Sequence, residues 1–480
     1  MRCLSCRNFL NEARQNSDAH FFTERKMKKG EIGNGTVGTT LYPDRGFIET
    51  PDGKVSLKHV IPGQTVEYRI IKKRKGTGEG KILKVLSKSP LETETDSCPH
   101  ADRCGGCLYQ TVPYDEQLRI KEAQVKKLLA DFADECSWEE IIGSPLEKAY
   151  RAKMEYTFGN EYKDGPISLG LHRRDSRFDI IPVPECRIAH SDFGKILSET
   201  LHYFETQDVS FYHKMDHEGI LRHLVIRRGQ KTGEILTDLI TASGLEKELL
   251  SGWKERVLSL KTEGEICGIL HTVNDSLSDA VIDQGTEILY GRDCFYEDIL
   301  GLRFKITPFS FFQNNSGAAE LLYLKVKEYA GDIGGMTIFD LYCGTGTISQ
   351  VLSRYAKQTV GVEIVSEAVK AAEENAERNG IRNCTFREGD VQAVLEETAV
   401  KPDMIVLDPP REGVHPKALS LIASYGVERI VYISCKATSM QNDLTVLKDY
   451  GYRVKKICCV DMFPQTPNVE TVCLLTRRNS

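Results

Sequence analysis

A cysteine at the end of a predicted strand is the side chain best placed for nucleophilic chemistry. Cys435 ends the apolar run over residues 429–435, whose length and Ile/Val content predict a buried parallel strand. The carboxyl ends of such strands form the edge at which open α/β sheets bind ligands. Because the thiolate form of cysteine is a strong nucleophile, Cys435 is a candidate catalytic residue.

A glycine loop upstream predicts a nucleotide-like cofactor. Gly344 and Gly346 follow a predicted strand, and Glu363 closes the next strand. This arrangement lets the backbone approach a cofactor while the carboxylate accepts hydrogen bonds from ribose hydroxyls. The loop, opened by Asp340, lacks a third glycine. In this it resembles S-adenosylmethionine-dependent methyltransferases of the Rossmann-like class, which bind no pyrophosphate.

The motif Asp408-Pro-Pro-Arg411 narrows the predicted chemistry. Amino-group methyltransferases typically carry an aromatic residue after the two prolines, where this chain has Arg411. RNA cytosine-5 methyltransferases usually carry a cysteine in the equivalent loop, and this loop has none. Cys435 remains at the end of the next strand, with Glu470 35 residues further on. This pair suits methylation of a uracil ring at carbon.

The two residues match the two halves of that reaction. Uracil C5 is a poor nucleophile, but addition of a thiolate at C6 places negative charge on C5, which can then attack a methyl group. A base must afterwards remove the C5 proton so that the thiol can leave, and Glu470 is the candidate base. The alternative for Cys435 is a buried core thiol. Its combination with Asp408 and Glu470 favours the nucleophile.

The elements that must position these residues alternate between strand and helix after Thr307. Helical segments such as Ser366 to Arg378 separate the strands, which predicts a doubly wound sheet. The last two strands have only a turn between them and are expected to form a hairpin. Strands are predicted over residues 337–341, 359–363, 385–388, 403–407, 429–434, 453–460 and 470–475.

The amino-terminal part has a different sequence pattern. Five short β-rich runs between residues 28 and 89 are separated by glycine and proline, which predicts a small barrel of the oligonucleotide-binding kind. Residues 26 to 88 hold 14 Lys and Arg against six Asp and Glu, although the whole chain has a net charge of −6. A basic module can attract phosphates that the total charge conceals. The other interpretation is an ordinary solvated face.

Length and composition set the remaining bounds. A chain of 480 residues predicts about three domains. No apolar stretch approaches the roughly 20 residues of a membrane helix, and no secretory signal is visible, so we expect a cytoplasmic protein without a membrane partner. The 15 cysteines are then expected to be reduced. Cys3 and Cys6, in a loose extension, are weak evidence for zinc without a second pair.

Together the carboxy-terminal motifs resemble the RNA uracil-5-methyltransferase family, which modifies ribosomal and transfer RNA. The resemblance covers nearly everything after residue 25 and implies that Gln313, Tyr342, Glu363 and Asp408 hold the cofactor. It also implies Cys435 as nucleophile and Glu470 as base. The motifs are Ser310-Phe-Phe-Gln-Asn-Asn315, Phe339-Asp-Leu-Tyr-Cys-Gly-Thr-Gly346, Asp408-Pro-Pro-Arg411, Ile433-Ser-Cys-Lys436 and Met462-Phe-Pro-Gln-Thr-Pro-Asn-Val-Glu470.

Two positions depart from the family pattern. The family often has Asn-Pro after the nucleophile, where this chain has Lys436 and Ala437, and often has histidine where Asn468 stands. Neither departure removes a reacting atom, but both could change the shape of a loop or the contacts of the base.

Four cysteines match the iron-sulfur subgroup of the same family. Cys98, Cys104 and Cys107 are clustered, and Cys186 lies far downstream. Spacing alone leaves a [4Fe-4S] cluster and a four-thiolate zinc site equally open. The resemblance favours the [4Fe-4S] cluster, with a structural role or a role in shaping the RNA surface, since methyl transfer moves no electrons.

The resulting hypothesis is a multidomain α/β methyltransferase that makes 5-methyluridine in structured RNA. We expect an extension (1–25), a TRAM barrel of OB type (26–89), a central α+β iron-sulfur domain (90–305) and a Rossmann-like methyltransferase domain (306–480). The expected substrate is an unpaired or flipped-out uridine of 23S ribosomal RNA. Transfer RNA uridine-54 and a non-catalytic RNA-binding or RNA-folding role are the alternatives. A monomer is expected.

Basic residues of the central region could contact the RNA. Arginine suits phosphate contacts and stacking on unpaired bases. The candidates that could line an RNA channel together with the barrel are Arg173, Arg174, Arg222, Arg227 and Arg228. For any one of them, ordinary surface charge is the other interpretation.

Overall fold

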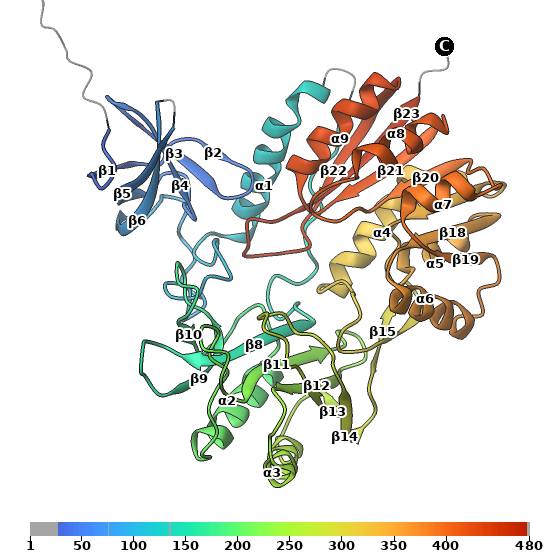
Figure 1. Ribbon diagram of the computed structural model, residues 1–480. Coiled ribbons are helices and arrows are strands. Elements are labelled where there is room, and N and C mark those ends of the chain that lie inside the picture. Colours follow the sequence, from blue (N-terminus) through green and yellow to red (C-terminus); the bar gives the residue numbers. More distant parts are fainter. Residues whose placement is uncertain (1–26, 75, 134–135, 478–480) are drawn as a thin grey trace, which may run out of the picture. The chain divides into compact units, whose positions relative to one another are not determined.

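The computed structural model describes residues 27–74, 76–133 and 136–477, which divide into two compact units (Figure 1). The smaller unit runs to Thr40 and continues over Arg45–Pro90, and the larger unit comprises Leu41–Asp44 and Leu91–Ser480. The predicted extension over residues 1–25, with Cys3 and Cys6, lies outside the described residues.

The smaller unit is a six-stranded sheet with its own apolar core. The strands follow the order β1-β5-β6-β4-β3-β2, and side chains such as Val37, Ile48, Val55 and Leu57 are buried between them. Each of the five predicted strands is present, and β2 is additional. The strands are β1 (Ile32–Thr36), β2 (Thr40–Leu41), β3 (Arg45–Thr50), β4 (Gly53–Lys58), β5 (Thr65–Arg74) and β6 (Thr77–Ser87).

The larger unit contains a seven-stranded sheet in its first part. The order is β10-β9-β8-β11-β12-β13-β14, and two helices pack on it through a core that includes Phe193, Leu197 and Trp253. A separate hairpin, β15–β16, follows. The elements are β8 (Lys153–Asn160), β9 (Ile167–His172), β10 (Ile180–Ile181), α2 (Ser191–Glu205), β11 (Leu221–Arg228), β12 (Glu234–Thr241), α3 (Lys247–Leu258), β13 (Glu265–Val273), β14 (Thr286–Gly291), β15 (Phe295–Ile299) and β16 (Leu302–Ile306).

The second sheet of the larger unit has eight strands in the order β19-β18-β17-β20-β21-β23-β22-β7. The first five are parallel, whereas β23 runs antiparallel to both β21 and β22. The predicted doubly wound sheet with a final hairpin is therefore confirmed. The strands are β17 (Thr337–Leu341), β18 (Gln358–Glu363), β19 (Cys384–Glu388), β20 (Met404–Leu407), β21 (Arg429–Ser434), β22 (Tyr452–Val460), β23 (Glu470–Arg477) and β7 (Ser137–Trp138).

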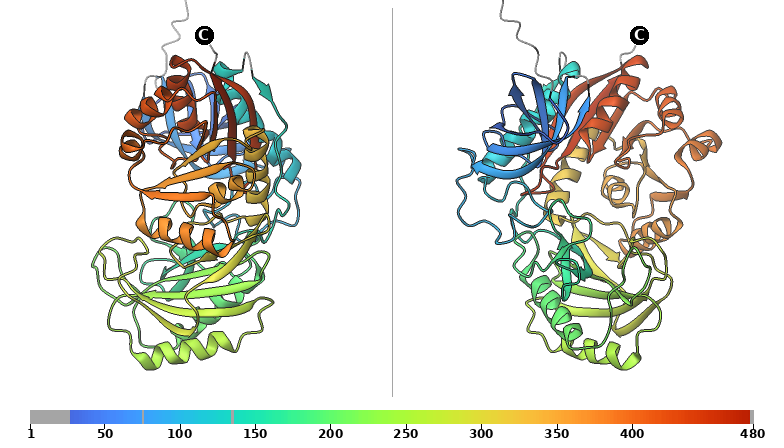
Figure 2. Two further views of the ribbon diagram at one scale, coloured as in Figure 1. Left: turned by 90° about the vertical axis from the view of Figure 1, so that its right-hand side faces the viewer. Right: turned by 60° about the vertical axis from the view of Figure 1, so that its left-hand side comes forward.

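Helices cover both faces of this sheet, because strand residues alternate between two apolar cores. Phe339 and Tyr432 face the core of α1, α7, α8 and α9, whereas Ile338 and Ile433 face that of α4 and α5. The orange and red helices and the yellow helix α4 lie on opposite sides of the strands (Figure 2, left). We call these the α9 face and the α4 face. The helices are α1 (Tyr114–Leu128), α4 (Ser316–Ala330), α5 (Thr347–Ser353), α6 (Ser366–Arg378), α7 (Val391–Glu397), α8 (Pro416–Ser424) and α9 (Ala437–Asp449), with the 3-10 turn η1 (Ala130–Phe132).

One feature of the sheet was not anticipated from the sequence. The strand β7 and the helix α1 precede the seven-stranded sheet in the chain, yet β7 pairs with β22 and α1 packs on the α9 face through Val125 and Leu129. Among the described residues, every helix is too short or too polar to span a lipid bilayer.

The hydroxyl group of Tyr432 is expected to contribute measurably to the free energy of unfolding. It donates a 2.6 Å hydrogen bond to Oδ2 of Asp443, which also accepts the amide N–H of Val414 at 2.9 Å. Because Tyr432→Phe leaves this carboxyl with one donor fewer, it should lower the free energy of unfolding by about 1 to 3 kcal/mol in urea titrations. Tyr355→Phe, at an exposed tyrosine, is the control. Equal stability of both variants would contradict this account.

Candidate active site

The antiparallel pairing of β21 and β23 brings Cys435 and Glu470 together. Ser434 pairs with Thr471 at the end of the ladder. Cys435 directly follows Ser434 and Glu470 directly precedes Thr471, so the two residues continue the register opposite each other. Side chains two residues apart along a strand lie on the same face of the sheet. Ile433 and Val472 lie on the α4 face, so Cys435, two residues after Ile433, and Glu470, two residues before Val472, lie on that face as well. Glu470 is buried and Cys435 is partly buried.

Two residues of the loop after β20 complete this group. Asp408 follows the last residue of β20, and Arg411 lies three positions later. Asp408 raises the pKa of both the Cys435 thiol and the Glu470 carboxyl, whereas Arg411 lowers the pKa of both. The four side chains are thus within electrostatic reach of one another.

Burial dominates the protonation of these groups. It raises the pKa of Cys435 to about 11, with Glu470 and Asp408 adding to the shift. Burial also raises the pKa of Asp408 to about 7 and that of Glu470 well above its ordinary value. The Arg411 guanidinium opposes the shifts of Cys435 and Glu470 and donates a hydrogen bond to the sulfur of Cys435. The Cys435 thiol and the Glu470 carboxyl therefore lie close together, largely buried, beside the Arg411 guanidinium.

The loop that carries Cys435 is held from both sides. Ser434 Oγ accepts the amide N–H of Lys436 at 3.1 Å and donates to its carbonyl oxygen. Ala437 is the first residue of α9. Proline is common at the first position of a helix, so alanine in place of the family's proline leaves the start of α9 unchanged. Lys436 is exposed beside the nucleophile.

A tyrosine far away in sequence also contacts this loop. Tyr42 belongs to the segment Leu41–Asp44 of the larger unit, and its hydroxyl donates a 3.2 Å hydrogen bond to the carbonyl oxygen of Cys435. Tyr42 is buried, and burial together with Glu470 raises its pKa above its ordinary value. The backbone of the candidate nucleophile is therefore anchored by a contact 393 residues apart in the chain.

The glycine loop has the conformation that a cofactor site needs. Tyr342, Gly344 and Gly346 all have positive φ, at +67°, +54° and +71°. A Cβ at Gly346 would lie 2.4 Å from Phe386, so only glycine fits there. At Gly344 an added Cβ would lie 3.8 Å from the ring of Phe311, an ordinary van der Waals contact, so its positive φ and not the available space favours glycine there.

Glu363 lies beside this loop as predicted. Its carboxylate accepts the amide N–H groups of Gly344 at 3.0 Å and of Ile364 and Val365 at 2.9 Å each. Asp340 is buried in β17 and accepts a 2.6 Å hydrogen bond from Ser349, and burial raises its pKa to about 7. The left-handed glycine loop with an acidic residue at the end of the next strand fits an adenosine-type cofactor.

Gln313 reaches the same region from the segment before α4. Its side chain is hydrogen-bonded to the hydroxyl of Tyr323, a buried residue of α4 that lies near Asp408, Asp340 and Glu470. Tyr323 therefore lies between Gln313 and the three acidic residues Asp340, Asp408 and Glu470 on the α4 face.

The four predicted metal-binding cysteines lie in a second place in the larger unit. They are free thiols, and burial raises the pKa of Cys107, with Cys186, Cys104 and Cys98 close enough to add to the shift. A backbone N–H of Gly106 donates to the sulfur of Cys104 at 3.4 Å. Within residues 27–74, 76–133 and 136–477, no three or more His, Cys, Asp or Glu side chains are grouped tightly enough to hold a metal ion.

Several arginines predicted to face RNA have structural roles instead. Arg222 is 2 % exposed and donates to the carbonyl oxygens of Asn274, Ser276 and Ser278. Arg227 is 4 % exposed and donates to the carbonyl oxygen of Ser310. The prediction for these two was wrong, because β11 is buried on both of its faces from Leu221 to Arg227.

The other three arginines differ in exposure. Arg174 holds the cysteine segment through the carbonyl oxygens of Ala101, Cys104 and Cys107. Arg228 lies beside Asp192, with only 15 % of its side chain exposed. Arg173 has 50 % of its side chain exposed and keeps the surface position that a phosphate contact needs.

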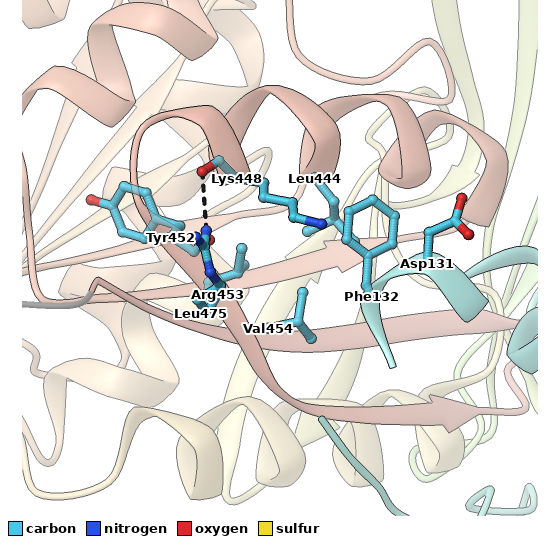
Figure 3. Close-up of a pocket in the computed structure, with 8 residues that line it drawn as sticks. All are labelled: Asp131, Phe132, Leu444, Lys448, Tyr452, Arg453, Val454 and Leu475. Carbon is cyan, nitrogen blue, oxygen red and sulfur yellow. Dashed lines mark hydrogen bonds between the residues drawn. The ribbon is translucent and has the colours of Figure 1, made fainter. Parts of the chain in front are cut away.

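A pocket of ≈ 160 Å³ lies away from these residues (Figure 3). It is lined on the α9 face by Phe132, Leu444, Val454 and Leu475, with Lys448, Tyr452, Arg453 and Asp131 around them. Cys435 and Glu470 lie on the opposite face. The active site is therefore identified by its chemistry and not by this hollow.

Sequence reasoning missed three residues of the site. Arg411 was considered only because it is not aromatic. Its cation, three residues after Asp408, could have suggested a charge that balances Asp408 and Glu470. Tyr323 follows the buried positions Ala319 and Leu322 along α4, a helical period that was visible. Nothing local in the sequence marks Tyr42.

The chain is similar to known proteins over nearly its whole length. A family model for tRNA (uracil-5-)-methyltransferase matches residues 298–478. An uncharacterized RNA methyltransferase of Clostridium tetani is 44 % identical over 455 residues, which are 95 % of this chain and 99 % of that protein. One from Caldanaerobacter subterraneus is 44 % identical over 452 residues, 94 % of this chain and 100 % of that protein.

A solved structure extends the similarity to three dimensions. The crystal structure of Pyrococcus abyssi tRNA (uracil-54, C5)-methyltransferase in complex with S-adenosyl-L-homocysteine superposes with a TM-score of 0.72 at 26 % identity. The match covers 92 % of this chain and 99 % of that one.

Because Arg411 lowers the pKa of Cys435, it should increase the rate at which this thiol is alkylated. Arg411→Met should raise the thiol pKa further, so the thiolate fraction at pH 8 falls and alkylation by iodoacetamide slows several-fold. Peptide mass mapping during alkylation measures the rate at Cys435, and Cys136 in the same samples is the internal control. An unchanged rate at Cys435 would show that the guanidinium does not act on the sulfur.

Proposed function

Because the chain belongs to the RNA (uracil-5-)-methyltransferase family, we propose that it methylates C5 of a uridine through a covalent bond between Cys435 and C6 of the base. The observation that carries this proposal is the placement of Cys435 opposite Glu470, with Asp408 and Arg411 beside both. A nucleophile and a base on the same face of two paired strands can act on adjacent ring carbons.

The residues divide the reaction between them. The Cys435 thiolate adds to C6, and the electron pair of the C5–C6 double bond moves toward C5 and the C4 carbonyl. S-adenosylmethionine, when bound, supplies the methyl group as a sulfonium. Glu470 then takes the C5 proton, the C5–C6 double bond re-forms, and Cys435 leaves as a thiolate. The raised pKa of Glu470 makes its carboxylate a stronger base for that step.

Four residues would hold the cofactor. Glu363 would accept the ribose hydroxyls, and Tyr342 belongs to the left-handed loop that approaches the cofactor. Gln313 and Asp408 lie near the end of the cofactor that would face Cys435. Arg411 would favour the thiolate by its charge and its hydrogen bond to sulfur.

The four cysteines Cys98, Cys104, Cys107 and Cys186 would hold a [4Fe-4S] cluster, with zinc as the alternative. The effect of Cys98 on the pKa values of Cys104, Cys107 and Cys186, beside that of burial, supports a shared site, because a bound cation would offset the negative charge of neighbouring thiolates. The amide of Gly106 beside Cys104 suits a sulfur-bound cluster. We assign the cluster a structural role.

The RNA would be ribosomal or transfer RNA. A TRAM-type barrel, which we propose for residues 26–89, and a cluster on the cysteine set would favour 23S ribosomal RNA as the substrate. The similarity to the Pyrococcus abyssi enzyme supports transfer RNA uridine-54 as the second candidate. A monomer with one catalytic centre in the cytoplasm is sufficient for either reaction.

Trapping experiments test the covalent mechanism. Cys435→Ala should abolish methyl transfer while S-adenosylhomocysteine still binds, since the thiol adds to the ring and does not contact the adenosine. Glu470→Gln should accumulate a methylated protein–RNA adduct that resists denaturation, because elimination needs the base. Release of tritium from C5-labelled 23S and transfer RNA transcripts measures turnover and identifies the substrate.

The controls separate this mechanism from its rivals. Lys417→Ala, at an exposed position of α8, should react like the wild type. Normal turnover by Cys435→Ala would exclude the covalent route. RNA binding without methyl transfer to any transcript would favour the non-catalytic alternative.

Metal analysis tests the cysteine set. Protein purified without oxygen should contain about four iron atoms per chain and absorb visible light. Cys186→Ser should lose most of this iron, because it removes one of four ligands, whereas Cys136→Ser should retain it. One equivalent of zinc without visible absorption would identify a zinc site instead.

A further inference from the structure

The loop over residues 461–469 sets the position of Glu470. It connects β22 to β23, and Glu470 is the first residue of β23. Atom Oε2 of Glu470 is buried and has no hydrogen-bond partner in the described part of the chain. Since this oxygen has no side-chain anchor there, the placement of the carboxyl depends on the backbone that leads to it.

That backbone is held by donors from outside the loop. Four consecutive carbonyl oxygens each accept a hydrogen bond from a distant part of the chain, an arrangement that fixes the path of the loop. The contacts are Asn315 Nδ2 to Met462 O (3.2 Å), Lys121 Nζ to Phe463 O (3.0 Å), Tyr150 OH to Pro464 O (2.9 Å), and the amide N–H groups of Leu108 and Tyr109 to Gln465 O (2.9 Å each).

The helix α1 supplies a fully buried ion pair at the start of the loop. Lys121 Nζ lies 2.7 Å from Oδ1 of Asp461, and both side chains are 0 % exposed. The same oxygen accepts the amide N–H of Phe463 at 3.0 Å. A buried charge is tolerated only with its partner in place, so this pair allows little freedom to Asp461.

One turn earlier, Gln117 of α1 forms a reciprocal pair with Gln465. Its Oε1 accepts the amide N–H of Gln465 at 2.8 Å, and its Nε2 donates to Oε1 of Gln465 at 3.0 Å. Gln465 has φ +70°, a left-handed conformation that a non-glycine residue adopts only with support. Gln117 is itself fully buried and also donates to the carbonyl oxygens of Tyr109 and Val112.

We propose that Gln117 and Lys121 are positioning residues for the second half of the reaction, in which the C5 proton is removed. They hold the loop over residues 461–469 so that the Glu470 carboxylate meets that proton, while the C5–C6 double bond re-forms and the sulfur of Cys435 leaves. This inference rests on the proposed role of Glu470 as base. Cys435 has separate anchors in Ser434 and Tyr42, so its addition to C6 should be spared.

The test is the ratio of two steps in single-turnover reactions. Gln117→Met should transfer a labelled methyl group at nearly the wild-type rate but release C5 tritium about tenfold more slowly, because the base is misplaced. The methylated adduct should accumulate, as in Glu470→Gln. A role in folding alone would slow both steps equally and leave no adduct.

Matched variants keep the result interpretable. Lys121→Met combined with Asp461→Leu removes both buried charges together and should show the same ratio, whereas Lys127→Met, on the exposed side of α1, should not. Thermal unfolding and S-adenosylhomocysteine affinity verify that each variant is folded. Equal slowing of both steps, or an unchanged ratio, in both Gln117→Met and the double variant would overturn the proposal. Absence of an adduct in Glu470→Gln would instead overturn the proposed function.

Discussion

The register between β21 and β23 is the constraint on which the catalytic arrangement depends. In a purely parallel sheet, the carboxyl end of one strand meets only the carboxyl ends of its neighbours. Here β23 runs the other way, so its first residue lies beside the last residues of β21. A thiol at the end of one strand and a carboxyl at the start of the other therefore meet on one face. A shift by one residue would turn them to opposite faces.

The electrostatics of the site follow from that placement. Asp340, Asp408, Glu470 and Cys435 all lie on or near the α4 face, where burial favours their neutral forms. Arg411 is the cation that opposes this effect at both Cys435 and Glu470. A positively charged cofactor bound in this site would lower the pKa of these groups and so shift them toward their ionised forms.

Segments distant in sequence support this short catalytic core. Tyr42 anchors the carbonyl of Cys435, and α1 with the residues after Cys107 anchors the loop before Glu470. Cys435 and Glu470 are therefore held by different parts of the chain. The segment after Cys107 also reaches the loop before Glu470, because the amide N–H groups of Leu108 and Tyr109 donate to the carbonyl oxygen of Gln465.

The sequence alone determined seven of the eight strands of the carboxy-terminal sheet, all but β7, because continuous apolar runs ending in Asp408, Cys435 or Glu363 leave little choice of element or polarity. It also singled out Cys435 and Glu470 as the candidate nucleophile and base, since a thiol and a carboxyl are chemically distinctive at those positions. Tertiary structure decided which arginines are buried, because a strand pattern does not tell which face of a sheet is covered, and Arg222 and Arg227 were misjudged for that reason. It alone revealed Tyr42, Gln117 and Lys121, whose partners lie more than 300 residues away, a range over which no local pattern carries information.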